Sequence, residues 1–185
     1  MSKCIKFARI NSTQDYAKKI AKESPSGTVV VAEEQTKGRG QFGRTWSSQK
    51  GGLYFSIILK PKISPDKIPL LTLKMAWAII DSLKKIVGKK YKFWVKPPND
   101  VMVTPKSEVR SHKKIAGILT ESSITRNKID WVIIGVGVNI NNEIPKNLKD
   151  IAISLKEIIG KKTNITNVFN KITVVWQISH FSNEK

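Results

Sequence analysis

The chain has 185 residues and a mass of 20.8 kDa, a size that suits one domain around one hydrophobic core. Hydrophobic residues make up 40% and charged residues 25% of it, which excludes a disordered, collagen-like or disulfide-stapled chain. The single cysteine, Cys4, leaves no internal disulfide, and His112 and His180 lie far apart in sequence. Redox chemistry and a structural metal are therefore not expected.

The most unusual bulk property is the net charge of +19, from 33 basic and 14 acidic residues. Lysine accounts for 28 of the basic residues and arginine for only 5. A Lys-rich surface is also produced by coding bias, whereas phosphate-reading proteins often use arginine, so nucleic-acid binding is an alternative and not the main expectation. Without a signal segment or a run of ~20 apolar residues, the sequence predicts a cytoplasmic protein.

The first 60 residues predict a strand, a helix and two further strands. A strand at 4–10 precedes a helix that Asn11 or Ser12 caps and that continues to Ala21. A β-branched strand at 28–32 leads into a polar, glycine-punctuated stretch, after which a strand resumes at 53–59.

The rest of the chain predicts one long helix, more strands and a helical end. The long helix covers 68–87, and Gly88 is expected to end it in left-handed geometry. A strand at 91–95 is interrupted by Pro97 and Pro98, and a short strand follows at 101–103. The remaining expected elements are an exposed hairpin tip at 104–113, strands at 115–122 and 130–140, a short helix at 154–159 and an amphipathic helix at about 166–181.

The most informative segment is the loop at 35–46, in which three glycines alternate with basic residues. Gly38, Gly40 and Gly43 satisfy G-x-G-x-x-G, but a dinucleotide fold needs a helix to begin there, and this loop leads into a strand instead. Glycines still let backbone N–H groups approach an anion, while Arg39 and Arg44 neutralise its charge. The segment therefore predicts a phosphate-holding loop, against the alternative of a flexible solvated hairpin tip.

Three further segments carry polar residues or glycines at strand ends. Lys96, Asn99 and Asp100 flank the two prolines and form a set that suits a triphosphate with Mg²⁺, although a turn with Asx hydrogen bonds explains them equally well. Lys114 stands at the mouth of an apolar strand, three residues before Gly117. The strand at 133–139 contains two glycines that core packing does not explain.

Taken in order, these motifs resemble the biotin protein ligases over about residues 5–160. The segments that carry the resemblance are Ser12-Thr13, Gln35, Gly38-Arg39-Gly40, Gly43-Arg44, Trp46, Lys96 to Asp100, Lys114, Gly117 and Gly135-x-Gly137-x-Asn139. The resemblance implies an α+β fold, a mixed β-sheet flanked by helices like that of class II aminoacyl-tRNA synthetases. It also implies a two-step reaction, in which biotin and MgATP form biotinyl-5'-AMP and the biotinyl group passes to a lysine of a biotin carboxyl carrier protein or another biotin-dependent carboxylase.

The resemblance also assigns roles to individual residues. Lys114, Arg39 and Arg44 would be catalytic, with Lys114 at the α-phosphate. The residues assigned to biotin are Ser12, Thr13, Gln35, Gly38, Arg39 and Gly117. Those assigned to ATP and the adenylate are Arg39, Arg44, Trp46, Lys96, Asn99, Lys114 and Asn139, with Asp100 toward Mg²⁺. Bringing two anions together requires such a cationic, backbone-lined pocket.

Several positions depart from the family pattern. Gln41 replaces the second arginine of Gly-Arg-Gly-Arg, which predicts weaker retention of the adenylate and stray biotinylation of nearby lysines. Pro97 replaces a tryptophan, and Gln14 replaces an asparagine. We expect one catalytic domain at 1–185, without the N-terminal DNA-binding domain or the C-terminal SH3-like domain of other members, and thus no specific DNA partner and no membrane partner.

Two other activities stay open at this stage. A lipoate ligase or octanoyltransferase would share the transfer of an acyl group to lysine, but its Gly-Gly-Gly loop and histidine motif are not seen. A basic nucleic-acid-binding protein is the alternative from another class. A homodimer is a further expectation, and acidic carrier domains would be attracted by the positive surface.

Overall fold

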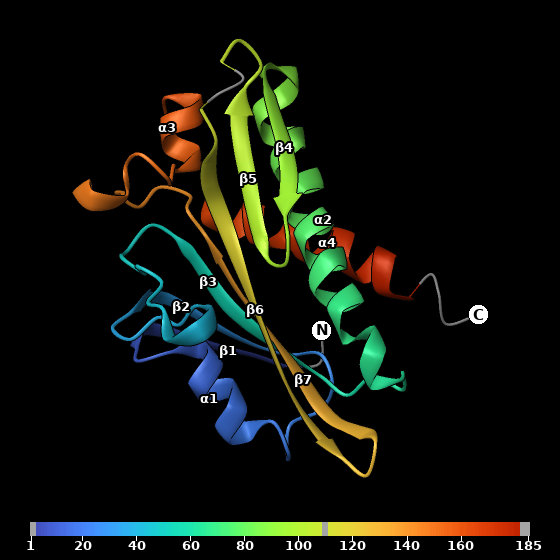
Figure 1. Ribbon diagram of the computed structural model, residues 1–185. Coiled ribbons are helices and arrows are strands. Elements are labelled where there is room, and N and C mark those ends of the chain that lie inside the picture. The colour runs from blue at the N-terminus through green and yellow to red at the C-terminus, as the bar shows by residue number, and fades with distance from the viewer. Residues whose placement is uncertain (1–2, 109–110, 182–185) are drawn as a thin grey trace.

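The computed structural model describes residues 3–108 and 111–181, and its centre is a mixed seven-stranded sheet (Figure 1). In the sheet the strands follow the order β1-β2-β3-β7-β6-β5-β4. Only β1 and β2 run parallel, and the other neighbours are antiparallel. The strands are β1 (Lys3–Ile10), β2 (Thr28–Gln35), β3 (Leu53–Leu59), β4 (Tyr91–Lys96), β5 (Asp100–Pro105), β6 (Lys113–Thr125) and β7 (Lys128–Val138). This is the mixed, helix-flanked sheet that the resemblance implies.

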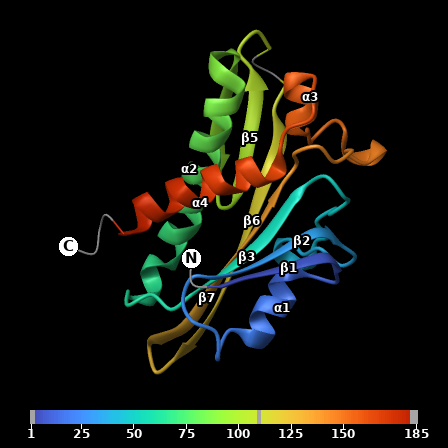
Figure 2. The ribbon, with the colours of Figure 1, turned by 180° about the vertical axis from the view of Figure 1, so that it is seen from behind.

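Within the described part of the chain, four α-helices flank the sheet: α1 (Thr13–Ile20), α2 (Ile68–Val87), α3 (Leu155–Ile159) and α4 (Ile165–Phe181). Helices α2 and α4 pack on one face and α1 on the other, as the two opposite views show (Figures 1 and 2). Of the helices within the described residues, none is both long and apolar enough to cross a membrane.

Strand alternation explains the two faces. Val29 and Ile57 belong to the large core beneath α2 and α4, whereas the next residues, Val30 and Ile58, pack against Ala17 of α1. The face beneath α1 has the much smaller apolar cluster, because α1 has only eight residues. Part of this second face is therefore left for polar residues and a cavity.

Most of the predicted elements are confirmed. Ser12 is the cap of α1, with its Oγ accepting from the backbone N–H of Asp15 at 3.2 Å. Helix α2 has the expected bounds, and Gly160 ends α3 in left-handed geometry. On α4 the expected apolar face is buried at Val168, Ile172 and Trp176.

A few boundaries differ from the sequence expectation. Gly88 has a positive φ of 76° but a ψ of −154°, which is outside the left-handed helical region, because the chain continues directly into a 3-10 turn. Strand β2 extends to Gln35, since it pairs with β1 over this length. Thr104 is buried within β5 and is not part of an exposed tip, and residues 109–110 of that predicted tip lie outside the described residues.

Candidate active site

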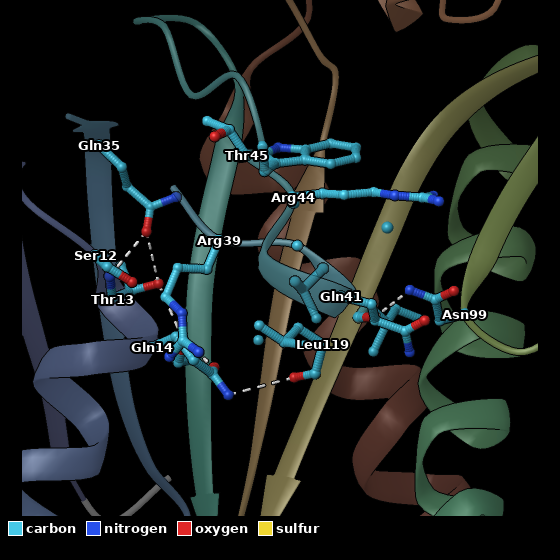
Figure 3. Close-up of a pocket in the computed structure, with 18 of the residues that line it drawn as sticks. Ser12, Thr13, Gln14, Gln35, Arg39, Gln41, Arg44, Thr45, Asn99 and Leu119 are labelled. Carbon is cyan, nitrogen blue, oxygen red and sulfur yellow. Dashed lines mark hydrogen bonds between the residues drawn. The ribbon is translucent and has the colours of Figure 1, made fainter. Parts of the chain in front are cut away.

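A pocket lies on the α1 side of the sheet, beneath the loop that follows β2 (Figure 3). Strands β3, β7 and β6 supply its floor, because Ser56, Gly135 and Leu119 are in register across these three neighbouring strands. One row further, Gly137 is paired with Gly117. Helix α1 and the glycine-rich loop form the walls.

The strand glycines make room for the side chains that line this pocket. A Cβ on Gly135 would collide with the side-chain oxygen of Gln14, and one on Gly137 would collide with the Trp46 indole. A Cβ on Gly117 would lie 2.9 Å from the same indole. The two glycines in 133–139 are thus explained by close approach of side chains, which an apolar core does not require.

The buried end of the pocket is a network of uncharged polar groups. Gln35 Oε1 accepts from the Thr13 backbone N–H at 2.8 Å and from Thr13 Oγ1 at 3.1 Å. The Gln35 amide nitrogen donates to Ser48 Oγ at 2.8 Å. Ser56 Oγ lies 3.0 Å from both Thr13 Oγ1 and Gln14 Oε1. Such a set of fixed amides and hydroxyls suits the recognition of a neutral ligand group with both donors and acceptors.

Lys114 and Asp100 form an ion pair at the opposite end of the pocket, with Nζ and Oδ1 2.6 Å apart. Lys114 Nζ also lies 4.9 Å from the centroid of the Trp46 ring, a cation–π contact. An irregularity in the β5–β6 pairing explains how Lys114 shares a face with Gly117, three residues away, since regular alternation would place them on opposite faces.

The turn between β4 and β5 is fastened to β6. Asn99 Nδ2 donates to the carbonyl of Ile118 at 2.8 Å, and the Ile118 N–H donates to the carbonyl of Asn99 at 3.0 Å. The Asn99 amide therefore bonds to a neighbouring strand, where the turn interpretation expected an Asx bond within the turn. This arrangement holds Asn99 and Asp100 at the pocket wall.

Two arginines of the glycine-rich loop line the pocket in different ways. Arg39 Nη1 lies 2.7 Å from Asp15 Oδ1 of α1 and 3.3 Å from Glu121 Oε2 of β6. Arg44 makes no ion pair with any described residue. In Figure 3 Arg39 points toward Gln14, whereas Arg44 extends toward the Asn99 side.

The charges around Arg39 stabilise one another. Burial opposes the charge on Arg39, but its hydrogen bonds and attraction to Asp15 and Glu121 outweigh this, so the pKa of Arg39 is raised. Burial likewise favours neutral Glu121, yet hydrogen bonds from Lys18 and Gln14 and the charge of Arg39 lower its pKa below the ordinary value. Both groups are therefore charged at neutral pH.

The structure brings ten of the thirteen predicted site residues to this pocket. These are Ser12, Thr13, Gln35, Arg39, Arg44, Trp46, Asn99, Asp100, Lys114 and Gly117. They come from four segments of the chain, 12–13, 35–46, 99–100 and 114–117, which the fold places next to one another.

Gly38, Lys96 and Asn139 do not line the pocket. Gly38 lies behind it, where a Cβ would collide with Ser48 Oγ. Lys96 lines an adjoining cavity that shares Asp100 and Lys114 with the pocket. Asn139 is buried, and its side-chain oxygen accepts from Asn142 Nδ2 at 3.1 Å, so its amide holds the loop after β7.

The sequence interpretation missed the pocket residue Ser56 and the two carboxylates that hold Arg39, Asp15 and Glu121. Ser56 is the one polar residue in the otherwise apolar run of β3, and that isolation was a usable signal. Asp15 and Glu121 had no such signal, because charged residues on a helix and at a strand end are ordinary surface features. Only the fold shows that both face Arg39.

Comparison with known proteins gives consistent matches. Residues 6–139 match the model of the Biotin/lipoate A/B protein ligase family. The chain is 38% identical over 173 residues to the bifunctional ligase/repressor BirA of Bacillus subtilis, covering 91% of this chain and 50% of that protein. It is 33% identical over 134 residues to the biotin–[acetyl-CoA-carboxylase] ligase of Paracoccus denitrificans, covering 72% and 53%. The chain thus spans about half the length of these curated relatives.

Solved structures agree with the sequence matches. Biotin protein ligase from Aquifex aeolicus in complex with biotin and ATP superposes with a TM-score of 0.77 and 35% identity, over 96% of this chain and 70% of the other. The Leishmania major enzyme in complex with biotinyl-5-AMP superposes with a TM-score of 0.76 and 27% identity, over 96% and 75%. A family match over most of the chain, the fold and the pocket lead to one conclusion: the chain belongs to the Biotin/lipoate A/B protein ligase family.

Proposed function

We propose that this protein is a cytoplasmic ATP-dependent biotin protein ligase. It would form biotinyl-5'-AMP from biotin and ATP, and then transfer the biotinyl group to a lysine of a biotin carboxyl carrier protein. The observation that carries the proposal is the pocket itself, where a neutral hydrogen-bonding end and a cationic end face each other across a glycine floor. Relatives named biotin ligases, two of them solved with biotin and ATP or biotinyl-5-AMP, support it.

The polar end suits the ureido ring of biotin, which has two N–H donors and one carbonyl acceptor. Thr13, Gln35 and Ser56 are fixed by mutual hydrogen bonds, so little conformational entropy is lost when they bind a ring of this kind. The family also includes lipoate ligases, whose dithiolane ring has no such donors. This difference favours biotin over lipoate as the acyl substrate.

The cationic end suits the reacting groups. In the first step a biotin carboxylate oxygen bonds to the α-phosphorus of ATP and pyrophosphate leaves. Arg44 and Lys114 would offset the repulsion between the two anions and stabilise charge on the phosphoryl oxygens. In the second step a lysine amine attacks the acyl carbon, the bond from this carbon to the phosphate oxygen breaks with its electrons going to AMP, and the amine nitrogen releases a proton to solvent.

Trp46 is a further feature of the pocket that favours binding of a ligand beside Lys114. Its indole N–H is buried and has no hydrogen-bond partner among the described residues. An unpaired buried donor costs about 1–3 kcal/mol, so a turn of the indole toward a ligand acceptor would remove this cost.

Magnesium would accompany the triphosphate. Within the described residues there is no group of three or more His, Cys, Asp or Glu that could hold a metal ion. Mg²⁺ is commonly held by one or two carboxylates together with substrate phosphates, and Asp100 is the carboxylate that lines the pocket. Asp100 would therefore be its protein ligand, and the metal would neutralise phosphate charge.

The test of the proposal is exchange of labelled pyrophosphate into ATP. We expect wild-type protein to catalyse exchange only when biotin is present. Lys114→Ala should lower the rate by about 10²-fold, the usual loss when one charge-stabilising donor is removed. Lys113→Ala is the matched control, because Lys113 Nζ donates to the Lys149 carbonyl and does not line the pocket. Absence of exchange in the wild type, or equal rates in the two variants, contradicts the proposal.

A further inference from the structure

Arg39 is bonded to two carboxylates, whereas the sequence predicts that it contacts the phosphates directly. Its guanidinium is held by Asp15 at 2.7 Å and by Glu121 at 3.3 and 3.4 Å. Glu121 is fixed in turn by Lys18 at 2.7 Å and by Gln14 at 2.9 Å. The loop is thereby fastened to helix α1 on one side and to strand β6 on the other.

Arg39 and Arg44 differ in the net positive charge that each brings to the pocket. The cluster of Arg39, Lys18, Asp15 and Glu121 contains two positive and two negative charges, so Arg39 adds no net positive charge to the pocket. Lys114 is likewise paired, with Asp100. Among the basic residues that line the pocket, Arg44 alone has no ion pair with a described residue.

Backbone pairing within the loop couples the position of Arg39 to that of residues 44–46. Arg39 and Thr45 form an isolated antiparallel bridge. The Gly40 N–H donates to the Arg44 carbonyl at 2.7 Å, and the Trp46 N–H donates to the Gly38 carbonyl at 2.9 Å. Residues 38–40 and 44–46 therefore form a short antiparallel β-ladder. A contact that holds one side of this ladder also holds the other.

The tip of the loop contrasts with its base. Phe42 and Gly43 have positive φ values of 55° and 73°, and Phe42 is 89% exposed. The tip, Gln41–Gly43, has no charged side chain that could form an ion pair, whereas the base is held at Arg39. Motion of the loop would then be confined to its tip.

We propose that Arg39 is a positioning residue, bridged by Asp15 and Glu121, and that Arg44 is the loop arginine that meets the anionic ligand. The bridge sets the place of Arg44 and Trp46 over the pocket through the ladder of the loop. This inference deepens the proposed biotin ligase function and rests on it. It replaces the expectation that Arg39 binds the phosphates directly.

Asp15→Asn gives opposite results under the two roles. If Arg39 is a positioning residue, the variant loses one half of the bridge, and pyrophosphate exchange falls by about tenfold through a lower kcat. If Arg39 is a phosphate ligand, the variant frees a positive charge beside the pocket, and the KM for ATP falls instead. Glu34→Gln is the matched control, because it removes one carboxylate that pairs with Arg9 outside the pocket. An exchange rate equal to that of the control, or a lower KM, overturns the inference.

Arg39→Lys separates charge from geometry. Lysine keeps the positive charge but lacks the planar fork that reaches two carboxylates at once. A positioning role predicts that Arg39→Lys lowers kcat as Asp15→Asn does, with little additional loss in the double variant because both changes break the same bridge. A direct phosphate role predicts that Arg39→Lys keeps most of the activity, and that result overturns the inference.

Hydrogen exchange tests the bridge without any enzyme assay. Amides of residues 38–46 should exchange about two- to fivefold faster in Asp15→Asn and in Glu121→Gln than in the wild type or in Glu34→Gln. Unchanged protection overturns the inference even if the protein is a ligase. Faster exchange in a protein without biotin-dependent activity would instead retain the bridge and reject the proposed function, so the two failures are distinguishable.

Discussion

Single residues in this protein are placed by partners that lie far away in the sequence. Glu121 shows this most clearly, since it contacts Gln14, Lys18 and Arg39, all more than 80 positions earlier. A carboxylate with these partners is more stable when charged, which is why its pKa is lowered. The same contacts tie β6 to the first helix and to the loop.

The lowered pKa of Glu121 predicts how stability depends on pH. Its contribution is fully present above the ordinary pKa near 4.5 and is lost as pH falls through the lower folded-state pKa. Glu121→Gln should therefore unfold at a lower temperature than wild type at pH 7, and the difference should shrink at pH values below 4. Thermal unfolding by circular dichroism across this pH range measures it. A difference in Tm that is constant with pH would contradict the prediction.

At the scale of elements, the site depends on the irregular segments between regular strands. The pairing irregularity in β6 turns Lys114 toward the pocket, and the turn at Asn99 is fastened to the same strand. The glycine-rich loop has a bridged base and an exposed tip at Gln41–Gly43. The tip is the part that would close over an activated intermediate and exclude water.

Gln41 lies in this tip and lines the pocket, where it supplies no positive charge. If adenylate escapes more easily because of this, Gln41→Arg should retain it better and lower the biotinylation of unrelated lysines several-fold. The measurement is labelling of a bystander protein, scored relative to labelling of the carrier. Gln49→Arg, which adds the same charge outside the pocket, serves as the control. Equal bystander labelling by wild type and Gln41→Arg counts against this role.

The whole molecule carries +19, far more positive charge than one binding pocket needs. Long-range attraction of this kind accelerates association with acidic partners and weakens as salt shortens the screening distance from about 10 Å at 0.1 M to about 3 Å at 1 M. It has little effect on which group the pocket recognises. Under the proposed ligase function, the charge would therefore affect transfer to the carrier more than the chemistry in the pocket.

Transfer to an acidic carrier domain should accordingly slow as salt rises. Between about 0.05 and 0.5 M salt we expect kcat/KM for the carrier to fall by about tenfold or more, because steering acts on the association rate. A carrier whose acidic side chains away from the target lysine are replaced by amides should show a much weaker dependence. A salt response that is the same for both carriers would exclude electrostatic steering.

Local sequence features predicted most of the secondary structure and most of the residues of the site. Hydrophobic periodicity, caps such as Ser12 and the glycine-rich loop are local features, and local physics decides them. The motifs and the family resemblance named thirteen site residues, and ten of them line one pocket once the fold brings their segments together.

The partners that these residues contact were set by the packing of distant segments. Strand register places Ser56, Gly135 and Leu119 side by side, and helix packing brings Asp15 to Arg39. The chain order does not contain this information, because a charged or polar side chain looks the same in sequence whether water or an opposite charge faces it. Arg39 and Asn139 therefore have recognisable motifs, but their surroundings had to come from the fold.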